Sequence, residues 1–363
     1  MKARYEQITP GGRLIAVSDL HGNATILDRL LEKVGFGSSD TLVIDGDFIE
    51  RGPDSLGTVR RAMRLAEGGN VFCTQGNGDY QILRAIFDNG QLYGQSLRSY
   101  LSWQKNSLAL EMLRAVSPSF TNGDDPEPLL PLVREEFRRE LAFLDGLPAM
   151  LRAGRFLFVH GGLTDPDPEV CAQGETWPLL KNDAYLLHAC RSEYWQVVGH
   201  WPVTLYRGAY PDCSPVVDRE KQVICIDGGC GLKPFAQLNA LLVPDVSRED
   251  FSFDWVSELP VIPSPAAQAA SERSISIKWP DNYVRVLERR DGLANVERIP
   301  YGTRLWVPEE YLFESGDGLR VDDVTDYLLP VEKGEPVYLI KRTPGRLLCK
   351  KEDGRVGWIL EEA

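Results

Sequence analysis

The sequence has very few histidines and no long apolar run. Only four of its 363 residues are histidine, so each histidine that lies in a motif is a candidate for a specific role. No apolar stretch approaches the length of a membrane-spanning helix, and no apolar signal core follows Met1. We therefore expect a cytoplasmic protein that does not bind membranes.

An excess of basic residues is also lacking. The chain has 40 Lys and Arg against 53 Asp and Glu, and its net charge is −13. General nucleic-acid binding depends on neutralising phosphates with Lys and Arg, so this class of function is disfavoured. A phosphorylated substrate stays compatible with the charge, because metal ions can dominate the charge inside a site.

Cysteine spacing typical of a disulfide framework or a zinc clip is absent as well. The seven cysteines are odd in number and scattered, and none form a Cys-x-x-Cys pair. This distribution favours reduced thiols that serve mainly in packing.

Five short apolar runs each lead to a metal-capable side chain beside a glycine. Residues 14–18 lead to Asp19 and His21, and residues 26–34 then show helical spacing. A carboxylate and an imidazole two residues apart in an extended segment point the same way and can hold one ion. The other four runs end at Gly46-Asp47, Gly76-Asn77, His160-Gly161-Gly162 and Gly199-His200. The fourth histidine, His188, lies in a helix-like apolar stretch, and we interpret it as structural.

Together these motifs resemble the calcineurin-like metallophosphoesterases over residues 12–245. The matching patterns are Asp-x-His at 19–21, Gly-Asp-x-x-x-Arg-Gly at 46–52, Gly-Asn-x-Asp at 76–79, His-Gly-Gly at 160–162 and Gly-His at 199–200. The Arg-Gly and His-Gly-Gly elements are similar to the phosphoprotein phosphatase and dinucleoside tetraphosphatase branch. The resemblance implies an α/β fold in which two packed mixed β-sheets are flanked by helices.

The resemblance also implies a pair of divalent metal ions. The six implied ligands are Asp19, His21 and Asp47 for the first ion, and Asp47, Asn77, His160 and His200 for the second. Asp47 would bridge the two ions. The mixture of carboxylate, imidazole and amide ligands suits manganese, with iron or zinc as alternatives. Arg51 would hold phosphate oxygens through its planar fork.

The sequence departs from the pattern of that family at two linked positions. The family usually has a histidine general acid after the asparagine of the third motif, where this chain has Gly78. It usually has an aspartate before Arg-Gly to orient that histidine, where this chain has Glu50. One hypothesis is that Glu50 enters the vacated space and donates the proton; the alternative is that no general acid remains. Asp79 is a further candidate, with a helix-capping role as its alternative.

The chain divides into two predicted domains. Residues 1–250 are the predicted metallophosphoesterase domain, with βαβ units over 12–79 and helices between 80 and 145. The resemblance implies that these helices partly cover the metal site; the alternative is that they only complete the core. A Pro/Ala-rich linker is predicted over 251–272. Residues 273–363 resemble Src-homology-3-like β-barrels, as two repeats or one elaborated barrel. This region is either a structural appendage or a docking module for a protein or peptide partner.

Three functions compete on the sequence alone. The leading hypothesis is a phosphomonoesterase resembling Ser/Thr protein phosphatases, supported by Arg51 and His160-Gly161-Gly162. The second is a phosphodiesterase or symmetrical dinucleoside tetraphosphatase, favoured by the missing histidine at Gly78. The third is a non-catalytic scaffold that binds phosphate, and the intact set of six ligands argues against it. The predicted substrate is accordingly a phosphorylated protein or a nucleotide.

Overall fold

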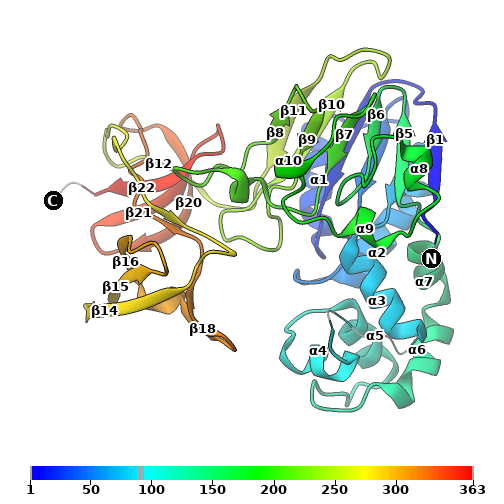
Figure 1. The fold of residues 1–363 in the computed structure, drawn as a ribbon, viewed down its shortest axis with the longest axis horizontal. Helices are drawn as coiled ribbons and strands as arrows, with labels where there is room; N and C mark the ends of the chain where they lie inside the picture. Colours follow the sequence, from blue (N-terminus) through cyan, green and yellow to red (C-terminus); the bar gives the residue numbers. More distant parts are fainter. Residues whose placement is uncertain (1, 89–91, 93, 362–363) are drawn as a thin grey trace. The chain divides into compact units, whose positions relative to one another are not determined.

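The computed structural model of the chain describes residues 2–88, 92 and 94–361. The outermost residues of the two predicted domains, 1 and 363, lie outside this range. The contacts divide the chain into two compact units, Met1–Pro202 with Pro215–Glu258, and Val203–Ser214 with Leu259–Ala363. Each unit is described by itself below (Figure 1).

The first unit contains a five-stranded sheet with the order β11-β10-β2-β3-β4. Its strands are β2 (Leu14–Ser18), β3 (Thr41–Asp45), β4 (Val71–Thr74), β10 (Leu238–Val243) and β11 (Ser252–Val256). Strands β2, β3 and β4 are parallel, whereas β10 is antiparallel to β2 and β11 is antiparallel to β10. Helices α1 (Ala24–Lys33) and α2 (Ser55–Ala66) make the two crossovers, so the predicted βαβ units are confirmed.

A second, six-stranded mixed sheet has the order β1-β5-β6-β7-β9-β8. Its strands are β1 (Tyr5–Ile8), β5 (Met150–Ala153), β6 (Phe156–Phe158), β7 (Trp195–Val198), β8 (Val216–Asp218) and β9 (Val223–Cys225). Alternation along β2 explains how the layers stack: Leu14 and Ala16 share a core with Phe156 of the second sheet, while Ile15 and Val17 share a core with the helices. The predicted fold of two packed mixed sheets flanked by helices is confirmed.

A helical segment joins β4 to β5. It comprises α3 (Asn77–Asp88), α4 (Leu97–Trp103), α5 (Leu108–Val116), the 3₁₀ turn η1 (Glu127–Leu129), α6 (Leu130–Glu136) and α7 (Arg138–Asp145). The apolar spacing over 97–112 is split into α4 and α5, because Gln104 and Ser107 adopt extended backbone conformations. Three short helices and one turn lie between β6 and β8: α8 (Pro168–Cys171), α9 (Trp177–Leu180), α10 (Tyr185–His188) and η2 (Val203–Tyr206).

The second unit is built from antiparallel sheets. Its elements are β12 (Val261–Pro263), β13 (Ser276–Ile277), β14 (Val284–Arg290), β15 (Leu293–Arg298), β16 (Arg304–Pro308), η3 (Glu309–Tyr311), β17 (Leu312–Ser315), β18 (Gly318–Val321), β19 (Val324–Thr325), β20 (Pro336–Thr343), β21 (Arg346–Lys350) and β22 (Val356–Leu360). The meanders β14-β15-β16 and β20-β21-β22 each have a bulge in the first strand, between Val286 and Glu288 and between Leu339 and Lys341. Each meander contributes to its own core. The predicted two-repeat organisation and the resemblance to Src-homology-3 barrels both stay predictions.

The segment predicted as a linker, 251–272, contains strands of both units. Strand β11 pairs with β10 in the first unit, and β12 pairs with β20 in the second. The second unit also includes Val203–Ser214, which the sequence placed in the first domain. The backbone of Pro211 accepts a hydrogen bond from Val356 N–H at 2.9 Å, and Tyr210 stacks on Tyr327 with ring centroids 4.3 Å apart. Across the described ranges, no helix is long and apolar enough to cross a bilayer.

Candidate metal centre

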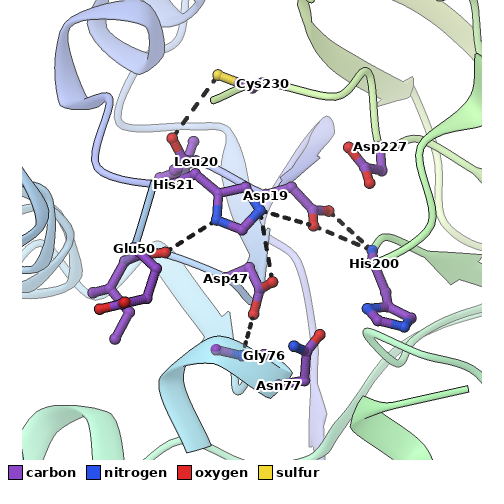
Figure 2. A network of polar contacts seen from close by, with 12 residues as sticks. Asp19, Leu20, His21, Asp47, Glu50, Gly76, Asn77, His200, Asp227 and Cys230 are labelled. Carbon is purple, nitrogen blue, oxygen red and sulfur yellow. Dashed lines mark hydrogen bonds and ion pairs between the residues drawn. The ribbon is translucent and has the colours of Figure 1, made fainter. Parts of the chain in front are cut away.

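The six side chains predicted as metal ligands converge at one edge of the two sheets. Asp19 follows β2, Asp47 follows β3, and Asn77 begins α3 just after β4. His160 follows β6, and His200 follows β7. Carboxyl ends of neighbouring parallel strands meet at a common edge, which is where ligand sites form in such sheets. Figure 2 shows five of the six, together with Asp227, around the same space.

The backbone is strained where these residues sit. Nine described non-glycine residues have positive φ, and six of them belong to the predicted site: Asp19, His21, Asp47, Glu50, Arg51 and His200. Such conformations cost about 1–3 kcal/mol each and persist where the surrounding structure enforces them. Their concentration at one edge makes that edge the candidate functional site.

Close packing explains the glycine beside His200. A Cβ on Gly199 would lie 2.3 Å from Oδ2 of Asp19, which no side chain can tolerate. With glycine there, the backbone N–H of His200 donates to both carboxylate oxygens of Asp19, at 3.2 and 3.1 Å. These hydrogen bonds connect the Asp-x-His motif at 19–21 to the Gly-His motif at 199–200.

The two oxygens of Asp47 face different halves of the ligand set. Its Oδ2 lies 3.7 Å from Nε2 of His21, which is itself 3.9 Å from Oδ1 of Asp19. Its Oδ1 lies 3.5 Å from Nε2 of His160, which is 3.3 Å from Oδ1 of Asn77. This geometry suits a carboxylate that bridges two positions.

The buried rings of His21 and His160 are oriented by backbone carbonyls. Nδ1 of His21 lies 3.0 Å from the carbonyl oxygen of Ile49, and Nδ1 of His160 lies 2.8 Å from that of Asp45. If each Nδ1–H donates to its carbonyl, each Nε2 presents a lone pair to the centre. Metal-binding histidines are usually held in this way.

His200 is held by a residue that the sequence reasoning missed. Its Nε2 lies 2.7 Å from Oδ1 of Asp183, which leaves Nδ1 as the nitrogen available to an ion. Asp183 lies between two short helices, away from any glycine corner, so no motif marked it. His188 is exposed, and its Nε2 lies 3.2 Å from the backbone carbonyl oxygen of Asp183.

Asp227 is a second residue that sequence reasoning left out of the ligand set. It is fully buried, its Oδ1 accepts from Gly229 N–H at 2.7 Å, and its Oδ2 has no hydrogen-bond partner. The only signal in the sequence was its position after strand β9 and before two glycines. It points toward the space beside Asp19 in Figure 2.

The electrostatics of the centre are those of a cation site. Burial, and then the nearby charge of Asp227, raises the pKa of Asp19 well above its usual range. Burial lowers the pKa of His160, but Asp47 and Asp19 outweigh it and raise that pKa. Burial also raises the pKa of Asp227 to about 6. Ligand atoms of Asp19, Asp47 and His160 lie within 4.8 Å of one another. Buried carboxylates need a counter-charge, and the orphaned oxygen of Asp227 adds to that need, so this set of residues fits divalent metal.

Glu50 lies next to the centre but its carboxylate is engaged elsewhere. Oε2 accepts from the Tyr100 hydroxyl at 2.6 Å, and Oε1 accepts from Ser107 Oγ and from Leu108 N–H, both at 2.9 Å. Burial raises the pKa of Glu50 to about 7. All three donors belong to α4, α5 and the turn between them.

Asp79 caps a helix and joins two loops. Its carboxylate accepts from the backbone N–H groups of Gly76, Asp47 and Phe48, at 2.9, 2.9 and 3.0 Å. Gly76 directly precedes α3, so the contact is that of an acidic residue in the first turn reaching back to the start of its helix. Burial, and then the charge of Asp47, raises the pKa of Asp79 to about 7.

Gly78 and Arg51, the two remaining positions of the predicted site, make different contacts. The N–H of Gly78 donates to Oδ1 of Asp47 at 2.8 Å. The side chain of Arg51 is exposed, and its backbone carbonyl accepts from Nδ2 of Asn106 at 3.1 Å. The predicted catalytic roles of Arg51, Glu50 and Asp79 stay predictions.

Comparisons with known proteins agree with this geometry. The calcineurin-like phosphoesterase family matches residues 12–225. The symmetrical bis(5'-nucleosyl)-tetraphosphatase of Ralstonia nicotianae is 41% identical over 68 residues, which is 19% of this chain and 23% of that protein. The protein of the same name from Neisseria meningitidis is 28% identical over 149 residues, which is 41% of this chain and 42% of that protein.

Among solved structures, a Saccharomyces cerevisiae protein serine/threonine phosphatase with similarity to human phosphatase PP5 covers 71% of this chain and 85% of its own, at 13% identity and a TM-score of 0.45. In the two sequence matches, by contrast, the chain spans less than half the length of the Ralstonia nicotianae and Neisseria meningitidis proteins. The family match covers more than half of the chain and includes all six converging side chains. This chain belongs to the calcineurin-like phosphoesterase family.

Proposed function

We propose that the chain is a metal-dependent hydrolase of phosphoanhydrides, with nucleoside polyphosphates such as symmetrical dinucleoside tetraphosphates as substrates. The observation that carries this proposal is the orientation of the predicted proton donors. Gly78 has no side chain, and the Glu50 carboxylate accepts its hydrogen bonds from α4, α5 and the turn between them. The Asp79 carboxylate is occupied by backbone N–H groups, among them that of Asp47. A phosphoanhydride leaves as a stable phosphate anion and needs little protonation, so it suits such a site.

The predicted site residues have separate roles in metal binding and phosphate binding. Asp19, His21 and Asp47 would hold one divalent ion, and Asp47, Asn77, His160 and His200 a second. When bound, such a pair supplies a hydroxide nucleophile near neutral pH and offsets phosphoryl charge. Arg51 would bind the non-bridging oxygens bidentately. Water adds across the anhydride: its oxygen bonds to phosphorus, and the bridging oxygen leaves with the electron pair of the broken bond.

The curated relatives support this substrate class. Those from Ralstonia nicotianae and Neisseria meningitidis are both named symmetrical bis(5'-nucleosyl)-tetraphosphatase. A phosphomonoesterase resembling Ser/Thr protein phosphatases is the second candidate, favoured by Arg51 and by the tight His160-Gly161-Gly162 corner.

The test compares substrates on the full chain loaded with manganese. We expect faster hydrolysis of diadenosine tetraphosphate than of p-nitrophenyl phosphate, with Asp47→Asn as the blank. Preference for p-nitrophenyl phosphate and phosphopeptides would move the proposal to the monoesterase. Rates at the level of the blank on every substrate would favour a phosphate-binding scaffold.

A further inference from the structure

The segment from α9 to α10 packs directly against the loop that carries His160. The N–H of Gly161 donates to the carbonyl of Leu179 at 2.8 Å. A Cβ on Gly161 would lie 2.7 Å from the backbone of Leu180, and one on Gly162 would lie 2.4 Å from the ring of Tyr185. Both glycines are therefore required for this segment to approach the centre. Close packing thus explains why glycine follows His160 at two successive positions.

This close approach places a lysine beside a predicted ligand. Nζ of Lys181 lies 3.3 Å from Nε2 of His200 and pairs with Oδ1 of Asp183. The side chain of Lys181 is 28% exposed and that of Asp183 is 46% exposed, so this pair is open to solvent. Asp183 holds the ammonium and the imidazole in one arrangement.

Trp177, one helical turn before the lysine, packs against Tyr80. The rings of Trp177 and Tyr80 are 5.8 Å apart between centroids, and both side chains are half-buried. The backbone N–H of Lys181 donates to the carbonyl of Trp177 at 2.9 Å, so the two residues are one helical turn apart. Tyr80 is three residues after Asn77 on α3, which is also about one turn.

Two cations are available to a phosphorylated ligand. Arg51 is the predicted phosphate contact, and Nζ of Lys181 lies 3.3 Å from Nε2 of His200. A substrate with one phosphate needs only one of these cations, whereas a chain of phosphates can contact both.

We propose that Lys181 and the ring pair of Trp177 and Tyr80 form a subsite for the nucleoside diphosphate portion of the substrate. Lys181 binds the phosphate next to the one attacked, and the rings stack on the base, as aromatic side chains commonly do with nucleobases. Asp183 is a positioning residue for Lys181. This inference rests on the proposed function, because it names the part of the substrate that this side of the centre recognises.

The test measures binding of ADP, the expected product, to the full chain with manganese by calorimetry. Lys181→Met should weaken ADP binding on the order of tenfold, since it removes a charge-assisted contact. Trp177→Ala should weaken ADP on the order of tenfold but leave pyrophosphate unaffected, because pyrophosphate has no base. Trp177→Phe keeps an aromatic ring and should retain most of the affinity, which separates stacking from a folding defect.

Exposed residues of the second unit provide matched controls, and Lys333→Met and Trp279→Ala should bind ADP as the wild type does. A wild type that does not bind ADP, or Lys181→Met and Trp177→Ala variants with wild-type affinity, would overturn the inference. Failure of the proposed function looks different: ADP binds and the variants weaken it, but diadenosine tetraphosphate is not cleaved.

Discussion

The Glu50 carboxylate accepts a 2.9 Å hydrogen bond from the backbone N–H of Leu108, the first residue of α5. A second carboxylate makes the reciprocal connection, because Glu111 on α5 accepts from the N–H groups of Ser55 and Leu56 at the start of α2. The loop that carries Arg51 lies between these two anchors. Glu50 therefore ties the loop that carries Arg51 to the helical segment.

Replacing Glu50 with Gln should loosen this connection. The amide would face three donors with only one acceptor oxygen, a loss of about 1–3 kcal/mol in local stability. Hydrogen exchange of the amides in α4 and α5 should accelerate accordingly, and Glu135→Gln on the exposed face of α6 should not change it. If Glu50 only positions, turnover falls by the same factor on good and poor leaving groups. A much larger loss on an alkyl phosphate would show that Glu50 supplies the proton.

Installing a histidine at position 78 should widen the substrate range. A Cβ there would lie 3.3 Å from Oδ1 of Asp47, a tight contact that a small shift relieves. The imidazole would place a proton donor at the position where the family usually has one, so Gly78→His should raise the rate on poor leaving groups by roughly 100-fold, the lower end of general-acid effects. Gly78→Ala adds the same Cβ without the imidazole and should show no gain. An equal gain in both variants would mean that backbone stiffening, rather than proton donation, is responsible.

The six predicted metal ligands stand out in the sequence because each lies within three residues of a strand end and within three residues of a glycine. That information is local. Asp183 could not be predicted in this way, because its role comes from a contact with His200, on another segment of the chain. The partners of Glu50 were equally hidden, since Tyr100 and Ser107 are 50 and 57 residues away in sequence.

The fold shows the same division between local and distant information. Strand and helix periodicity predicted the βαβ units, and the family resemblance predicted the two packed sheets with flanking helices. The assignment of Val203–Ser214 to the second unit depends on contacts such as the one between Cys213 N–H and the Gly354 carbonyl. No periodicity or turn signal in the short segment itself reports such a pairing.

Asp227 should contribute to metal affinity, and Asp227→Asn tests this. We expect manganese affinity to fall roughly 10–100-fold, as for other residues that support a metal site. The metal-free protein should become more stable, because the substitution removes one of several like charges buried near Asp19. Calorimetric titration with manganese and thermal unfolding of the metal-free chain measure the two effects. Asp291→Asn, an exposed control, should change neither.

A purely structural role for Asp227 predicts a different pair of results. If Asp227 only packs and accepts the hydrogen bond from Gly229, Asp227→Asn would lower the stability of the metal-free chain. Manganese affinity would then stay close to that of the wild type. Opposite signs for affinity and stability are therefore the result that supports a ligand or near-ligand role.

Lys350 in β21 should make the stability of the second unit depend on alkaline pH. Its side chain is fully buried, and burial outweighs the charges of Cys213 and Glu352 to lower its pKa to about 8. The unfolded chain, with a lysine pKa near 10.4, binds a proton in the interval where the folded chain does not. The free energy of unfolding therefore rises with pH between about 8 and 10.4, by roughly 3 kcal/mol from this group.

Lys350→Met should remove this rise, since methionine buries a similar volume without a charge. Urea unfolding of the full chain at pH 7.5, 8.5 and 9.5, compared between wild type and variant, isolates the contribution of Lys350 from other groups that titrate in this range. Lys333→Met, at an exposed position of the same unit, should keep the wild-type slope. Parallel curves for wild type and Lys350→Met would contradict the prediction and mean that the ammonium is fully compensated in the folded state.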